Sequence, residues 1–360
     1  MRLQHIFLLT FLAGIVLQSL FWQNNRLLDK GRWIVATEHL SRLDYMMFDP
    51  FTYGYPGTAI MVPAIAISLA TRVTMASAFV GSIVILVALF TACATVIVKK
   101  LQPENFSWIA VGATLLINQI YFAVTPPSAV ITPLFVLIAL VIALMDKEKG
   151  SSYLFWLLGI LLGVAASLRL DIAIVLTGPI LAFVYWGYSV KKTAQVAASA
   201  VLAFLVTNPF MWLVPWHHLH AFADKLFFHF FEFESHPLHI ALPHLTMQSA
   251  LALLGFALAL PVVAYTKLPS PLSRRVLVFL MMISVAITGG ILMSSYQVLW
   301  YFAPMIMLWE VLLIILASEL TVHIRTRYVY IANMAFCLLI IFWQSFMVLY
   351  RLSIDAVMNL

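Results

Sequence analysis

The sequence predicts an all-α integral membrane protein with about eleven transmembrane helices, because of its composition, the length of its apolar stretches and the placement of its cationic residues. Of its 360 residues, 64% are apolar and only 9% are charged, and the mean hydropathy is +1.03. Soluble domains are typically about 45–50% apolar and about 25% charged. A soluble fold could not bury so much apolar surface, so the expected solvent is a lipid bilayer.

The apolar stretches justify the number of helices. Runs of about 18–22 residues can cross the hydrocarbon core of a bilayer, which is roughly 30 Å thick. No composition shift, soluble domain or repeat divides the chain, which favours one transmembrane domain over residues 1–360. A shorter apolar stretch at 58–70 contains Pro63 and is expected to be a re-entrant or interfacial helix. The expected spans are approximately 5–22, 74–98, 106–124, 129–145, 153–168, 171–189, 194–213, 247–265, 276–293, 299–318 and 328–349.

Lysine and arginine residues predict the orientation of these spans, because cytoplasmic loops carry an excess of them. The bias is satisfied with the N-terminus inside, since Lys99/Lys100 and Lys191/Lys192 then fall in short inner connections. The C-terminus and two long connections, 23–73 and 214–246, are then expected outside the cytoplasm. The short loops favour a bacterial plasma membrane.

The residue content disfavours several classes of function. The net charge of +6 includes no Lys/Arg run able to grip a phosphate backbone, so no nucleic-acid partner is expected. Cys93 and Cys337 lie in apolar stretches and imply neither a disulfide nor a thiolate metal site. The inner loops contain no Gly-rich phosphate cradle, so no nucleotide cofactor is expected. The first apolar stretch lacks a small-residue cleavage site and is interpreted as a helix, not a signal peptide.

The first long connection contains a group of candidate catalytic carboxylates, Asp29, Asp44 and Asp49. A carboxylate at the membrane surface can deprotonate an acceptor hydroxyl or bind a divalent cation such as Mg²⁺ or Mn²⁺. Asp49 is therefore also a candidate metal ligand. The alternative is a solvated loop whose acids balance the neighbouring basic residues.

The second long connection is rich in histidine and phenylalanine. His217 and His220 lie one helical turn apart and are candidate metal ligands. The same loop carries Lys225. The alternative is an amphipathic interfacial helix whose phenylalanines face lipid and whose histidines lie at headgroup level.

Two other segments at the expected outer surface supply candidate substrate-binding residues. Arg169 directly follows a span, and a guanidinium is a good bidentate partner for a lipid phosphate. A self-compensating pair of Arg169 and Asp171 is the alternative. Tyr301 lies in the aromatic segment Trp300–Pro304, which an aromatic belt at the membrane interface explains equally well.

The features that follow the first span occur in a distinctive order. Asp29 comes first, then the aromatic residue Trp33 and a short helix, then Asp49 before a proline, and finally the turn Tyr55–Gly57. This order resembles the first extracytoplasmic loop of the GT-C superfamily of polytopic glycosyltransferases. The chain departs from that pattern at Lys30, where a second acid is common, and at the last residue of the turn, where a second proline is common.

Three later segments are also similar to parts of GT-C enzymes. Leu162–Leu176 resembles a basic–acidic turn between two central helices. Asn208–Phe210 opens a segment that resembles the large outer loop. Trp300–Pro304 resembles an aromatic segment that ends in proline.

The resemblance, in particular to protein mannosyltransferases and aminoarabinose transferases, implies an enzyme. It would transfer a hexosyl or pentosyl group, with inversion, from a polyprenyl-phosphate donor to a lipid, glycan or protein acceptor. It implies that Asp29 accepts the acceptor proton, that Tyr55 lines the substrate site, and that a cation, Arg169 or Lys225 stabilises the leaving lipid phosphate. A transporter or lipid flippase, and a non-catalytic subunit of a membrane complex, are the alternatives.

Overall fold

A computed structural model of the chain describes residues 2–21, 30–42, 44, 58–101, 134–136, 138, 152–168, 187–208, 216, 220, 274–275, 278–279 and 282. Regular secondary structure in this part of the chain is entirely helical, as the composition predicts. Its main helices are α1 (Leu3–Phe21), α2 (Lys30–Ser41), α3 (Thr58–Thr71), α4 (Met75–Leu101), α7 (Ser152–Leu168) and α9 (Val190–Thr207).

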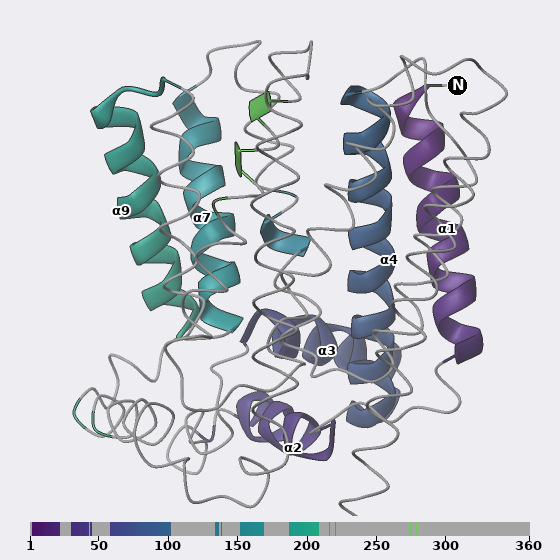
Figure 1. Cartoon of the computed structure of the whole chain (residues 1–360). Helices are drawn as coiled ribbons and strands as arrows, with labels where there is room; N and C mark the ends of the chain where they lie inside the picture. Colours follow the sequence, from purple (N-terminus) through teal and green to yellow (C-terminus); the bar gives the residue numbers. More distant parts are fainter. Residues whose placement is uncertain are drawn as a thin grey trace, which may run out of the picture.

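The long helices of the described part pack as two pairs. α1 contacts α4, and α7 contacts α9 (Figure 1). The short helices α2 and α3 lie crosswise at one end of the long helices, and α3 contacts α4 as well as α7. This end of the fold, named here the α2–α3 end, therefore links the two pairs.

The direction of each long helix follows from its connections. α1 begins at the end of the fold opposite α2 and α3, α4 runs back toward that opposite end, and α7 and α9 both begin there (Figure 1). The opposite end consequently receives the last turn of α4, with Lys99 and Lys100, and the first turn of α9, with Lys191 and Lys192. Glu38 and Asp44 belong to the α2–α3 end.

Two helices of the described part are long and apolar enough to cross a membrane by length and composition. They are Met75–Ile97 within α4, with 23 residues, and Val190–Thr207, with 18 residues. α1 and α7 contain shorter apolar stretches, Leu3–Ser19 and Phe155–Leu168. The remaining predicted spans lie largely or wholly outside the described residues.

The boundaries of α9 correct the expected span of 194–213. The helix begins at Val190, because the Ser189 side chain caps it by accepting a hydrogen bond from the Lys192 backbone N–H. Lys191 and Lys192 are therefore the first turn of a helix and not part of a loop. The helix ends at Thr207, where Asn208 leaves the helical conformation and its backbone N–H donates to the Leu205 carbonyl. The same kind of shift extends α4 through Lys100 to Leu101.

α1 packs on α4 through residues that are spaced four apart and so lie on one face of the helix. Ile6, Thr10, Gly14 and Gln18 are buried along this face. A Cβ atom added to Gly14 would lie 3.0 Å from the Cα atom of Ala88 in α4. The small residues on both sides allow the two backbones to approach closely, which is how membrane helices typically pack.

α7 and α9 run parallel to each other and pack even more closely than α1 and α4 do. Gly159 lies against Ser199, and Gly163, four residues later, lies against Ala200 and Ala203. A Cβ atom on Gly163 would be 2.8 Å from the Ala203 Cβ atom, and one on Gly159 would overlap the Ser199 side chain. Two small residues spaced four apart on each helix form this contact, as in the GxxxG pattern of membrane helix pairs.

Apolar side chains cover the outward faces of these helices. On α9, Leu202 is 58% exposed and Val206 is 65% exposed. The buried faces, in contrast, contain hydroxyls that donate to carbonyls three or four residues earlier, such as Thr95 to Thr91 at 2.8 Å. The exposed large apolar residues of α1 and α9 are Leu3, Leu8, Leu9, Leu12, Val16, Val190, Val201, Leu202, Leu205 and Val206.

The helix expected at 58–70 is confirmed as α3, which contains Pro63 in its interior. It joins α4 through residues 72–74. Arg72 has a φ of 59°, and its N–H donates to the Ser68 carbonyl at 2.8 Å, which ends α3. The Thr74 hydroxyl accepts a hydrogen bond from the Ser77 N–H at 3.3 Å, which caps the start of α4. Local bonds at both helix ends thus define the short connection between the crosswise α3 and the long α4.

Candidate functional site

The structure describes two of the residues predicted to form the site. Asp44 follows α2 at the α2–α3 end, and His220 is an exposed helical residue. The other predicted site residues lie outside the described residues, and these are Asp29, Asp49, Tyr55, Arg169, His217, Lys225 and Tyr301. The candidate site is therefore built from α2 and the residues that follow it.

α2 is held in place by one apolar face. Trp33, Ala36, Thr37 and Leu40 are buried and lie at the spacing of one helix face. The Thr37 hydroxyl donates to the Trp33 carbonyl at 2.6 Å, so this buried polar group has a partner. α2 contacts α3 and α4. Burial of the Trp33 side chain, which is 4% exposed, anchors α2 across the end of the long helices.

The chain turns back sharply where α2 ends. The Arg42 N–H donates to the carbonyls of Glu38 and His39, at 3.3 and 3.2 Å. The Asp44 N–H donates to the His39 carbonyl at 3.0 Å, a bond that spans six residues, as in common helix C-terminal turns. The Ser41 hydroxyl also bonds the Glu38 carbonyl, at 2.7 Å. Four hydrogen bonds therefore determine where Asp44 lies relative to His39.

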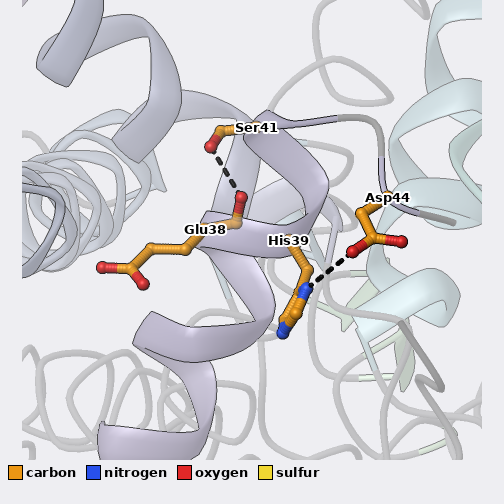
Figure 2. A network of polar contacts seen from close by, with 4 residues as sticks. All are labelled: Glu38, His39, Ser41 and Asp44. Carbon is orange, nitrogen blue, oxygen red and sulfur yellow. Dashed lines mark hydrogen bonds and ion pairs between the residues drawn. The ribbon is translucent and has the colours of Figure 1, made fainter. Parts of the chain in front are cut away.

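The turn brings the Asp44 carboxylate to the His39 ring. The His39 Nδ1 atom lies 3.3 Å from an Asp44 carboxylate oxygen, and the side chains are 28% and 36% exposed (Figure 2). A carboxylate in its ionised form only accepts hydrogen bonds, so with that form the contact requires a proton on Nδ1. The second ring nitrogen, Nε2, points away from Asp44 (Figure 2). The pair thus presents one oriented imidazole nitrogen next to α2.

His39 was not among the residues predicted from the sequence. The missed signal is the distance of five residues between a histidine in the last turn of a helix and an acid after it. Asp44, in contrast, was predicted and has a histidine partner here. Glu38 precedes His39 in α2, and its side chain extends away from His39 (Figure 2).

The described residues contain no group of three or more His, Cys, Asp or Glu side chains able to hold a metal ion. His39 and Asp44 alone supply two ligands, whereas protein cation sites commonly use three or more. The predicted ligands Asp49 and His217 lie outside the described part, and the pairing of His217 with His220 stays a prediction.

A second polar group belongs to the same end of the fold. Asn208 follows α9 and is 1% exposed. Its side-chain nitrogen donates to the Phe204 carbonyl at 2.6 Å, whereas its side-chain oxygen is buried and accepts no hydrogen bond from the described residues. Asn208 falls within the span predicted at 194–213, ahead of the second long connection predicted at 214–246.

Comparison with known proteins yields no relative: no model of a protein family matches the sequence, and no curated protein or solved structure shows a significant match.

Proposed function

We propose that this protein is an integral membrane glycosyltransferase of the GT-C type. It transfers a sugar from a polyprenyl-phosphate donor to a lipid, glycan or protein acceptor, and its active site faces away from the cytoplasm. The observation that carries the proposal is the arrangement of the first connection. The described residues between α1 and α4 form α2 and α3, which lie crosswise at one end, and a partly buried histidine–carboxylate pair lies at the end of α2. α2 begins directly after Asp29, and α3 begins directly after Tyr55–Gly57. Asp29 and this turn are among the features on which the resemblance to GT-C enzymes rests.

The faces of the long helices support a membrane environment. Large apolar side chains are exposed along α1 and α9. The contacts between helices contain small residues and hydroxyls that donate to backbone carbonyls of their own helix. In water such exposed faces would be costly, at about 25 cal/mol per Å² of apolar surface. In lipid they are solvated, and close contact through small residues becomes the main attraction between helices.

The proposed reaction is a single displacement at the anomeric carbon. The acceptor hydroxyl oxygen forms a bond to that carbon, the bond from the carbon to the phosphate oxygen breaks, and its electron pair leaves with the polyprenyl phosphate. A base takes the hydroxyl proton. By the family resemblance that base is Asp29, the residue before α2. Arg169, Lys225 or a divalent cation is proposed to stabilise the phosphate charge.

An assay of membranes that contain the protein tests the proposal. Polyprenyl-phosphate sugars with a radiolabelled sugar are the donors, and the product is radiolabel in an acceptor fraction. We expect transfer that depends on the protein. If labelled donor crosses the membrane intact and no acceptor is labelled, the protein is a transporter or flippase and the proposal fails.

The same assay with EDTA tests the metal. Transfer that EDTA abolishes and that Mg²⁺ or Mn²⁺ restores would assign a divalent cation to the site. Equal rates with and without EDTA would leave charge stabilisation to protein side chains.

A further inference from the structure

We propose that His39 is a catalytic residue that binds the donor phosphate, and that Asp44 is the residue that positions it. His39 would donate a hydrogen bond from Nε2 to an oxygen of the polyprenyl phosphate as the bond from the sugar to the phosphate breaks. The inference rests on the proposed function for its chemistry, but the phosphate site can be tested without transfer.

The first support is the geometry of the pair. Asp44 is fixed by the bond from its own N–H to the His39 carbonyl at 3.0 Å, and its carboxylate contacts the His39 Nδ1 atom at 3.3 Å. α2 is in turn fixed by its buried face, which includes Trp33. The imidazole is therefore oriented by a short local turn, and its Nε2 atom faces away from Asp44 (Figure 2). A site held this way loses little conformational freedom when a ligand binds.

The second support is charge. In the imidazolium form both ring nitrogens donate hydrogen bonds. Asp44 accepts from Nδ1, and a phosphate oxygen can accept from Nε2, so the cation lies between two anions. The donor is a phosphodiester, and the leaving polyprenyl phosphate gains one negative charge when the anomeric bond breaks. A donor aimed at this developing charge stabilises the transition state more than the ground state.

Glu38 provides the matched control. It is adjacent to His39 in the last turns of α2 and also ionisable, but its side chain extends away from the pair (Figure 2). Glu38→Gln removes a charge from the same helix without touching the proposed phosphate site. His39→Gln removes the imidazole, and His39→Arg supplies a cationic donor at the same position.

Binding of polyprenyl monophosphate to the full-length protein in nanodiscs is the test. We expect His39→Gln to weaken binding about tenfold or more, His39→Arg to restore part of it, and Glu38→Gln to leave it unchanged. Competition by inorganic phosphate separates a site for the phosphate group from one that also needs the lipid. Wild-type affinity in His39→Gln would overturn the inference.

Transfer kinetics separate this inference from the proposed function. In an active protein, His39→Gln should lower kcat about 10²-fold or more, in the range typical of such catalytic groups. Asp44→Asn should lower kcat while His39 is still present, and Asp44→Glu should recover part of it, which loss of a merely structural contact would not produce.

If the wild type transfers no sugar but binds polyprenyl monophosphate through His39, the proposed transfer fails and the phosphate site stands. If transfer is normal in His39→Gln, only the role of His39 is lost.

Discussion

Side chains near the end of α2 show how one helix turn can create a chemical site. His39 and Asp44 are polar residues of a kind that usually faces water, and each is only partly exposed. Their contact exists because the backbone after Ser41 turns back and bonds to the His39 carbonyl. As a result, Asp44, which in the sequence is only an acid in a loop, contacts a histidine whose ring is held in one orientation.

Asp29 gives the sharpest prediction at the scale of single residues. Asp29→Asn keeps the shape of the side chain but cannot accept a proton, so sugar transfer should fall at least about a hundredfold, in the range of general-base catalysis. The variant should be expressed and inserted like the wild type, which immunodetection in membranes checks. Full transfer by Asp29→Asn would show that Asp29 is not the base, and an inactive Asp49→Asn would then assign that role to Asp49.

Small residues determine which helices of this fold can approach each other closely. Gly159 and Gly163 of α7 face Ser199, Ala200 and Ala203 of α9 with no room for a side chain. Gly81 of α4, in contrast, has open space around it, because a Cβ atom added there would meet no atom of the described residues within 4 Å. Glycine is therefore required at the contact between α7 and α9, whereas α4 has room for a side chain at Gly81.

Alanine substitutions of these glycines test the pairing of the helices. Gly163→Ala should destabilise the protein by about 1–3 kcal/mol, as overpacking of a close contact typically does, because the added methyl group meets the Ala200 backbone. Gly81→Ala should be neutral or stabilising by up to about 1 kcal/mol, since Ala has the higher helix propensity. Thermal unfolding in detergent is the measurement. An equal melting temperature for both variants would contradict the close contact between α7 and α9.

At the scale of the whole molecule, the described residues distribute charge unequally between the two ends. The first turn of α9 and the last turn of α4 bring four lysines to the end opposite α2 and α3, where the described residues include no acid. At the α2–α3 end, Glu38 and Asp44 offset part of the charge of Lys30, Arg32, Arg42 and Arg72. Cytoplasmic segments of membrane proteins are enriched in lysine and arginine. The α2–α3 end is therefore expected outside the cytoplasm.

Cysteine labelling of intact cells tests this orientation. Ser41 and Lys191 are both exposed and belong to opposite ends. An impermeant maleimide should label Ser41→Cys in intact cells and should label Lys191→Cys only after permeabilisation. The parent protein, with its own Cys93 and Cys337, gives the background. Labelling of Lys191→Cys alone in intact cells would reverse the orientation and place the candidate site in the cytoplasm.

The sequence by itself determined the helical class, the course of α1, α4 and α7, and the short helix around Pro63, because helix formation in apolar segments depends on local length and composition. The start of α9 was predicted wrongly, because Ser189 caps the helix and places Lys191 and Lys192 in its first turn and not in a loop. Only the tertiary structure decided which helices pair, because the contact between Gly163 and Ala203 joins segments far apart in the chain. It also brought His39 to Asp44, since that contact depends on the path of the backbone after α2 and not on residue types alone.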